Sequence, residues 1–466
     1  MFAFSRNSPA GTIPINKLRS RNTTLRLMRE GPESSHPVRP EILTDERHHL
    51  RKAIALRHAV ALYVSSVLGS GVLVLPGLAA QIAGPSSLLA WLFLSLASYP
   101  FAYTFASLSA RNPESGGIYS FALESFGLHV ATIAGWLFAM WYVTGGPAVT
   151  LIAASYLAYA FPMSRDGIFL VAAAVIIVAF AVNYRGIVFS NKVQLVVVVL
   201  IVTLLVAVVA FSIGSVRQEN FLPFFPHGFF PVGTAAALIF WSFLGYENVS
   251  NIAEEFRDPK RDFKRSIALS VILIGGLYCA VAFVTVGTLA YEAGGSVAPF
   301  AAIFGNVLGR YGAVGTAILA IIIIFGTVNA YSAGISRVMY AVARDGGLPR
   351  TFHHLDQRTG VPARSLALLS GLSLIVLALY YLTDVNLETA LLIPSGAAIL
   401  VYVIGSAAGI RLLRGADERN IFAWLSLILS IAILPFVGTL AIVAIATALG
   451  GAAYKWILDR RAARDL

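Results

Sequence analysis

The sequence predicts an all-α integral membrane protein whose chain crosses the bilayer twelve times. Of the 466 residues, 58% are hydrophobic and only 12% are charged, whereas a soluble domain carries about 25% charged residues. The mean hydropathy is +0.77. Most of the chain consists of apolar runs of about 20 residues, the length that a helix needs to cross a bilayer. These runs do not alternate with period two, so a transmembrane β-barrel is excluded.

The beginning of the chain differs from all that follows. Residues 1–52 are rich in Arg, Ser, Pro and Asn and contain no long apolar run. A signal peptide would need an apolar core of roughly 7–15 residues after its basic start. We therefore expect a disordered basic arm in the cytoplasm. Met28 is an alternative start, because nothing before it has a structural pattern.

Residues 53–458 are predicted to form one membrane domain, followed by a short tail, 459–466. The twelve predicted helices cover residues 58–82, 87–110, 129–160, 166–184, 190–213, 232–253, 266–290, 312–342, 363–382, 386–410, 421–435 and 437–458. Several are longer than the bilayer requires and should be tilted or bent. The single cysteine, Cys279, excludes a disulfide scaffold.

Lysine and arginine determine the expected topology. With both termini in the cytoplasm, only three of the 34 Lys and Arg residues fall outside: Arg165, Arg217 and Arg310. Basic residues accumulate on the cytoplasmic side of membrane proteins, so we expect this arrangement in a plasma membrane of the bacterial inner-membrane type. The net charge of +11 then follows from topology and contact with anionic lipid. A nucleic-acid partner is not expected.

Two predicted helices contain interruptions near their middle. The first reads VSSVLGSGVLVLPG, with Gly69, Ser70 and Gly71 at its centre, and the sixth reads FWSFLGYEN around Gly245. A helix interrupted at mid-depth has to line a cavity or a site, because its freed backbone groups need partners. For either segment alone, small residues that let two helices pack closely are the alternative explanation.

The two interruptions fall at corresponding places in two halves of the domain, 58–213 and 232–410. Each half has five helices, an odd number, so the halves have opposite topology. Paired broken helices in inverted halves indicate the site of a secondary transporter. The N–H groups after Gly71 would bind an anion such as a carboxylate, and the carbonyls before Gly245 a cation such as an ammonium group. A site with these two poles suits a zwitterion.

Glu247 is the only carboxylate that this segmentation places deep inside a helix. Such a residue costs on the order of 2.5–3.5 kcal/mol on insertion scales and is a functional candidate by default. It would carry a proton coupled to transport, since burial favours the protonated carboxyl; the alternative is a neutral acid hydrogen-bonded to another helix. Glu247 and its neighbour Tyr246 are the candidates for coupling or gating. Trp241 would form an aromatic wall or gate over the substrate, with ordinary packing as the alternative.

Other residues of interest are expected to have structural roles. Trp136, Trp141 and Tyr142 on the third helix are expected to be packing or interface residues, and the run 145–147 (Gly-Gly-Pro) is expected to kink that helix and shape the cavity. The adjacent histidines at 353–354 do not make a metal site. No metalloprotease, phosphate-loop or nucleophile-elbow pattern is present. Neither a metal, a cofactor nor an enzymatic activity is therefore expected.

Four motifs resemble those of the amino acid–polyamine–organocation transporter superfamily. They are GSGVLVLPG (69–77), PESGGIY (113–119), EEFRDPKRDFKRSI (254–267) and SRVMYAVARDGGLP (336–349), the last followed by Val361-Pro362. They occur in the family's order over about 300 residues. The resemblance covers residues 58–458 and leaves only the arm and the tail outside.

The resemblance implies the five-plus-five inverted-repeat (LeuT-like) fold, with two further helices at 421–458. It implies that the substrate is bound by the backbone around Ser66, Gly69, Ser70 and Gly71 and by the segment Phe240, Trp241, Ser242, Phe243, Leu244 and Gly245. Trp241 and Glu247 fall where arginine–agmatine exchangers of this family place a substrate-facing tryptophan and a pH-linked glutamate. Several proton-coupled members carry a lysine near the middle of helix five. Here the only lysine of that helix, Lys192, lies at its cytoplasmic end.

The resemblance and the two-pole site predict a secondary amino acid transporter (permease, antiporter or exporter) that works by alternating access. The segment 240–263 looks most like the bacterial methionine and branched-chain amino acid exporters, which favours neutral L-amino acids. A cationic amino acid or polyamine exchanger and a nutrient sensor on the same fold remain alternatives. A channel would need a repeated pore motif, and a membrane enzyme a cluster of His, Asp or Glu; neither is present. Protons are the candidate coupling ion, and the oligomeric state is unknown.

Overall fold

The computed structural model describes residues 56–111, 117–186, 191–246, 259–292, 294–415 and 417–462. Every regular element in these ranges is a helix, either α-helical or 3-10. Nine stretches of the described chain are long and apolar enough to cross a bilayer, and Phe230–Phe243 is a shorter apolar helix. The predicted all-helical membrane class is therefore confirmed for these residues. The twelve crossings and the inverted repeat remain predictions.

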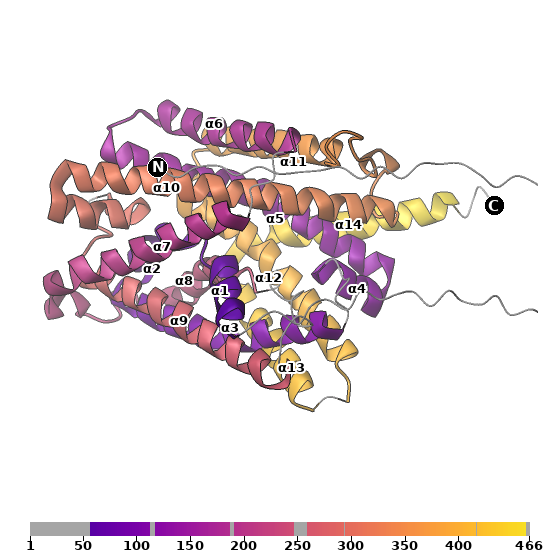
Figure 1. Ribbon diagram of the computed structural model, residues 1–466, viewed down its shortest axis with the longest axis horizontal. Coiled ribbons are helices and arrows are strands. Elements are labelled where there is room, and N and C mark those ends of the chain that lie inside the picture. Colours follow the sequence, from indigo (N-terminus) through magenta and orange to yellow (C-terminus); the bar gives the residue numbers. More distant parts are fainter. Residues whose placement is uncertain are drawn as a thin grey trace, which may run out of the picture. The chain divides into compact units, whose positions relative to one another are not determined.

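One set of helices, the broken-helix group, contains both predicted interruptions. Its members are α1 (Leu56–Val67), α2 (Leu75–Ala83), α3 (Ser87–Arg111), α8 (Phe230–Ile239) and α9 (Pro259–Gly287). Helix α9 lies against α1, α2 and α3, and α8 lies against α2 and α3. The two interrupted helices therefore share their neighbours, as Figure 1 shows in its lower part.

A second set, the central-helix group, surrounds the long helix α5. Its members are α5 (Leu128–Ala160), α6 (Arg165–Tyr184), α10 (Pro299–Arg344), α11 (Ala363–Leu382) and α12 (Leu387–Leu412). Helix α5 contacts each of the other four, and Figure 1 shows α6 and α11 side by side at the top. Many of the buried residues of α5 are alanines and glycines, and such small side chains let membrane helices approach closely.

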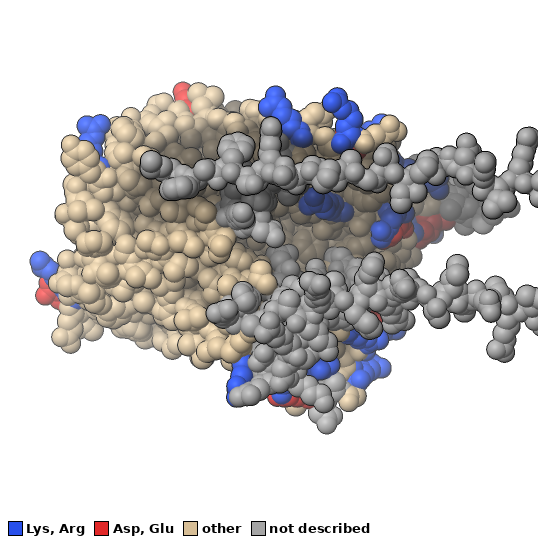
Figure 2. Space-filling view, in the orientation of Figure 1, with Lys and Arg blue, Asp and Glu red and all other residues tan. Residues whose placement is uncertain are grey.

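The remaining helices complete the described part of the molecule. They are α4 (Ile118–Phe126), α7 (Asn191–Ser212), α13 (Asp417–Ile433) and α14 (Ala441–Ala462). Helix α7 lies against α9 and α10, α13 against α3 and α12, and α14 against α5. On the face drawn in Figure 2, tan side chains cover most of the left half, and Lys and Arg are more frequent on the right. A wide uncharged surface of this kind fits contact with lipid chains.

Most predicted helix ends agree with the structure to within a few residues, but two regions are more irregular. The predicted helix 312–342 is the second part of α10, whose backbone leaves the helical conformation at Gly309 (φ 61°, ψ −150°). The predicted boundary near Pro435 lies within a 3-10 helix, η9 (Leu434–Leu440), that contains Gly438 at φ 67°. Glycine adopts these positive φ values without steric cost, so each break in the helical backbone occurs at a glycine.

Both predicted interruptions are present in the backbone. Helix α1 ends at Val67, Gly69 is extended (φ −125°, ψ −163°), and the 3-10 helix η1 covers Ser70–Leu73. Helix α8 passes into the 3-10 helix η5 (Phe240–Phe243), after which Leu244 is extended (φ −76°, ψ 145°). Gly245 and Tyr246 follow η5 as a turn, and residues 247–253 of the predicted sixth helix, including Glu247, lie outside the described residues.

Candidate functional site

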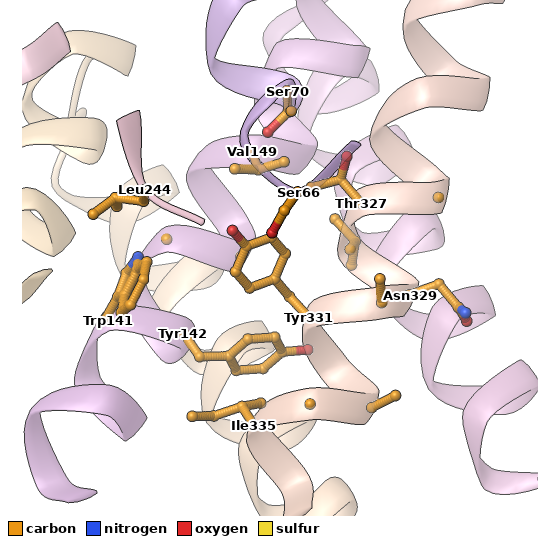
Figure 3. A pocket seen from close by; sticks show the side chains of 18 of the residues that line it. Ser66, Ser70, Trp141, Tyr142, Val149, Leu244, Thr327, Asn329, Tyr331 and Ile335 are labelled. Atoms are coloured by element: carbon orange, nitrogen blue, oxygen red, sulfur yellow. The ribbon is translucent and has the colours of Figure 1, made fainter. Parts of the chain in front are cut away.

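A cavity of about 850 Å³ lies at the two helix interruptions. Its wall is formed by α1, η1, α5, η5 and α10, with contributions from α6 and α7. Figure 3 shows the side chains of Ser66 and Ser70 from the first interruption, of Trp141 on α5 and of Tyr331 and Ile335 on α10 around this space. The cavity therefore lies between the broken-helix group and the central-helix group.

The described lining of the cavity is almost free of charge. Arg337 on α10 is its one charged side chain, and no Asp or Glu belongs to it. Its apolar and aromatic members include Phe138, Trp141, Val149, Ile201, Trp241, Leu244 and Ile335. Its neutral polar members include Ser66, Ser70, Ser242, Thr327 and Asn329. Such a wall suits a ligand whose charges are met by main-chain groups and whose side chain is apolar.

Ser66 and Gly245 join the two interruptions directly. The Ser66 hydroxyl donates a hydrogen bond of 2.7 Å to the Gly245 carbonyl oxygen. Gly245 has φ +124°, and a Cβ atom added to it would lie 2.3 Å from the carbonyl oxygen of Ser66. Both the backbone conformation and this close approach require glycine.

Tyrosine hydroxyls satisfy several of the carbonyls that the interruptions free. The Tyr278 hydroxyl on α9 lies 3.3 Å from the carbonyl oxygen of Val67 and 3.2 Å from that of Ser242. The Tyr156 hydroxyl on α5 donates to the carbonyl of Leu73 over 2.5 Å. Part of the hydrogen-bonding capacity at the interruptions is therefore used by the protein itself. The Ser242 hydroxyl is buried and has no partner within the described chain, so it can bond to a ligand.

The indole ring of Trp241 lies between two glycines. A Cβ atom at Gly71 would lie 2.8 Å from Cδ1 of the indole, and one at Gly145 would lie 2.5 Å from its Cη2. The ring is also nearly perpendicular to that of Trp141, at 84° with 6.1 Å between the centroids. Glycine at both positions makes room for the indole, which forms part of the cavity wall.

The structure brings most of the predicted binding residues to the cavity. Those that line it are Ser66, Gly69, Ser70, Gly71, Trp241, Ser242 and Leu244. Two predicted residues direct their side chains elsewhere: Phe240 packs against Phe101 and Tyr402, and Phe243 packs against Trp91 and Tyr278. Only their main-chain groups remain candidates for binding.

The two predicted coupling residues are placed differently. Tyr246 is fully buried, its ring lies 6.2 Å from that of Tyr63, and its hydroxyl lies 3.5 Å from the Ser98 hydroxyl. It is not part of the cavity lining. Glu247 lies outside the described residues, so its role remains a prediction.

The three aromatic residues of the third helix, expected to be packing or interface residues, pack against neighbouring side chains, and two of them also line the cavity. Trp141 and Tyr142 line the cavity, whereas Trp136 packs against Tyr454 and Gly451 of α14. The residues are neighbours in sequence, and the rotation of α5 relative to α10 decides which of them reach the cavity. That rotation depends on packing between helices distant in sequence.

The α10 wall of the cavity was not anticipated from the sequence. Thr327, Asn329 and Tyr331 line the cavity, and the Ser332 hydroxyl bonds to that of Tyr142. The Nδ2 group of Asn183 on α6 donates a 2.8 Å hydrogen bond to Oδ1 of Asn329. One signal was available: the polar residues of this stretch directly follow the apolar run IIIIFG. Intramembrane polar residues face a cavity or a partner.

A family model described as "Amino acid permease" matches residues 54–456 of the chain. The chain belongs to this family. It is therefore a multi-pass membrane protein of a family of amino acid transporters, and the family resemblance seen in the sequence is confirmed.

Relatives within the family support this membership and differ in the substrates that their names state. An uncharacterized amino acid permease of Bacillus subtilis, YecA, is 35% identical over 81% of this chain and 88% of its own length. The L-methionine/branched-chain amino acid exporter YjeH of Escherichia coli is 29% identical over 78% of this chain and 87% of its own. The vacuolar cationic amino acid transporter 2 of Arabidopsis thaliana is 30% identical over 72% of this chain and 56% of its own.

Proposed function

We propose that this chain is a secondary transporter for neutral L-amino acids, with methionine and the branched-chain amino acids favoured, and that it works by alternating access. The observation that carries the proposal is the cavity at the joined interruptions, whose described wall combines aromatic, aliphatic and neutral polar side chains with one arginine and no carboxylate. A family relative whose name states methionine and branched-chain export supports the same choice.

The substrate's two charged groups would be bound by the two interruptions. The N–H groups of Ser70 and Gly71 begin η1, and the first N–H groups of a helix have no acceptor within it. We assign the α-carboxylate to these N–H groups. The α-ammonium group would lie at the carbonyls of the segment 240–244, beside the Leu244 backbone at the cavity wall.

The substrate's side chain would occupy the space between α5 and α10. Trp141, Val149 and Ile335 line this part of the cavity, and apolar surface buried there contributes roughly 25 cal/mol per Å². A guanidinium or second ammonium group would find no acid among the described lining residues. The alternative is a cationic substrate that pairs with Glu247, and the name of the Arabidopsis relative favours keeping it as the second candidate.

Alternating access would expose the cavity to one side of the membrane at a time. The lining extends to Gly186, Arg337 and Val361, which belong to segments expected at the cytoplasmic side. We therefore assign the described conformation to a state open toward the cytoplasm, with the protein in the plasma membrane and both termini inside. Glu247 would carry the coupling proton.

Flux measurements in proteoliposomes test the proposal. The full chain would be reconstituted in liposomes loaded with unlabelled leucine and supplied with labelled Met, Leu, Ile, Val, Arg, Lys or putrescine, with and without an imposed pH gradient. We expect saturable exchange of Met and the branched-chain amino acids, and a gradient response that is lost in Glu247→Gln. Liposomes without protein control for leakage.

Each other outcome points to a different function. Exchange confined to Arg, Lys or putrescine, lost in Glu247→Gln, would establish the cationic exchanger instead. Measurable binding of amino acids without flux under any gradient would establish a nutrient sensor. A gradient response that survives Glu247→Gln would exclude this glutamate as the coupling group.

A further inference from the structure

Tyr278 lies where the two interruptions meet and is on neither broken helix. Its side chain comes from the middle of the continuous helix α9, is fully buried, and lies outside the cavity lining. Its hydroxyl is 3.3 Å from the carbonyl of Val67, the last residue of α1, and 3.2 Å from the carbonyl of Ser242 within η5. A tyrosine hydroxyl has one proton, so it is shared between the two carbonyls as a three-centre hydrogen bond.

These two carbonyls need an external partner because of the interruptions themselves. The last carbonyls of a helix find no N–H donor within it, and an unpaired polar group in the bilayer costs several kcal/mol. One hydroxyl therefore stabilises both helix ends, which lie 211 and 36 residues from Tyr278 in the sequence. The shared hydrogen bond from Tyr278 therefore keeps the end of α1 and the segment η5 at a fixed distance from each other.

Aromatic packing holds the Tyr278 ring in place. The Trp91 ring lies 5.5 Å from it at 69°, and the Phe243 ring lies 5.3 Å from it at 85°. All three side chains are at most 2% exposed. Edge-to-face contacts of this kind favour one ring orientation, so the hydroxyl is held toward the two carbonyls.

We propose that Tyr278 is a positioning residue that holds the two poles of the binding site at the separation of a substrate's carboxylate and ammonium groups. This inference rests on the proposed function. The carboxylate pole follows Val67 by a few residues, and the ammonium pole contains Ser242. A shift of one interruption relative to the other would change the distance between the poles while leaving each pole intact.

Tyr278→Phe tests the proposal, because it removes the hydroxyl and keeps the ring. We expect the KM for methionine in proteoliposomes to rise about fivefold, the factor that corresponds to one lost hydrogen bond, with Vmax changed less than about twofold. The preference for methionine over an analogue that lacks one of its two charged groups should fall by a similar factor. Suitable analogues are the methyl ester of methionine and its decarboxylated amine. A purely structural role would lower the amount of active protein and Vmax without changing this preference.

Tyr380→Phe is the matched control. Tyr380 is also a buried tyrosine whose hydroxyl donates to a main-chain carbonyl, that of Thr144, over 3.3 Å. That bond joins α11 to α5, and neither helix is interrupted there. We expect the KM for methionine, and the preference for methionine over analogues with one charged group, to remain at wild-type values in this variant. An equal change in both variants would overturn the proposal.

A measurement without substrate separates this inference from the proposed function. In Tyr278→Phe, amide hydrogen exchange should become faster at both interruptions, 67–74 and 240–246, and stay unchanged there in Tyr380→Phe. If the wild-type protein bound no amino acid, the proposed function would fall, and exchange at the interruptions would still decide whether Tyr278 joins them. Unchanged exchange at both segments would overturn the role of Tyr278.

Discussion

The Ser66 hydroxyl donates a 2.7 Å hydrogen bond to the carbonyl of Gly245, 179 residues further along the chain. This bond connects the end of α1 to the segment after η5, where both helices are interrupted. Gly245 approaches the Ser66 backbone so closely that no other residue fits. The two interruptions are therefore one structural unit.

Ser66→Ala should lower both stability and apparent substrate affinity. The substitution removes the hydrogen bond that the Gly245 carbonyl accepts from Ser66, and the loss of such a hydrogen bond costs about 1 kcal/mol. Thermal unfolding in detergent and methionine uptake in proteoliposomes measure the two effects. Ser155→Ala is the control, because the Ser155 hydroxyl donates to the Leu151 carbonyl of its own helix and Ser155 does not belong to the described cavity lining. Equal effects of both substitutions would contradict a specific role for the Ser66 bond.

Gly245→Ala should abolish transport and strongly lower the yield of folded protein. Its Cβ would lie 2.3 Å from the Ser66 carbonyl oxygen, at a φ of +124° that side-chain-bearing residues rarely adopt. Gly315→Ala on α10 is the control: a Cβ there meets nothing within 4 Å, and alanine is favoured over glycine in a helix by roughly 0.5–1 kcal/mol. Size-exclusion profiles and thermal unfolding distinguish the two. A folded, active Gly245→Ala protein would show that the two interruptions can separate.

Gly145→Ala should push the Trp241 indole into the cavity and reduce methionine binding. The added Cβ would lie 2.5 Å from Cη2 of that ring, and the rigid indole has to move as a whole. Trp241→Phe removes the clashing atoms, so the double variant should recover part of the loss. A double-mutant cycle on the Kd for methionine should yield a coupling of about 0.5–3 kcal/mol.

Gly146→Ala is the control for this cycle, because the nearest atom to its Cβ is Oγ of Ser373 at 3.7 Å, an ordinary contact. We expect nearly wild-type binding in this variant. Additive effects of Gly145→Ala and Trp241→Phe would show that Gly145 does not act through the indole.

The loop after α10 should lose protection from hydrogen exchange at acidic pH. The N–H and hydroxyl groups of Thr359, at 2.9 and 3.0 Å, together with the N–H of Arg358, lower the pKa of the Asp356 carboxyl. A lowered folded-state pKa means that the stabilisation is present above the ordinary aspartate pKa of about 3.9 and is lost as pH falls through the lowered value. Asp356 also donates its N–H to the Val361 carbonyl, and Val361 lines the cavity.

Amide exchange of residues 356–361, corrected for intrinsic rates, measures this effect at neutral pH and near pH 3. Asp356→Ala should remove the protection at neutral pH and make the loop insensitive to pH. Global unfolding should change little, because Asp356 lies in a loop and is only partly buried. Protection that is equal at both pH values in the wild-type protein would contradict the assigned role.

The sequence predicted the interruptions well because their causes are local. The glycines at 69 and 71 and the Pro76 that follows act within a few residues of each other. The same kind of reasoning did not predict that Trp141 and Tyr142 also line the cavity, since an apolar helix with little polar contrast does not reveal which of its sides faces a cavity. The polar residues of α10 contained a usable signal, because polar side chains are costly in the bilayer unless they face a cavity or a partner.

The sequence by itself determined the membrane class, the approximate ends of most helices, the two interruptions and the family. Each of these depends on run length, glycine placement or local motifs, which are properties of short segments. Only the tertiary structure decided which carbonyls are already bonded and how Trp241 fits between Gly71 and Gly145. It also placed Tyr278 against Val67 and Ser242. These contacts join residues up to 211 positions apart, and they depend on how whole helices rotate and slide against each other, which short segments do not encode.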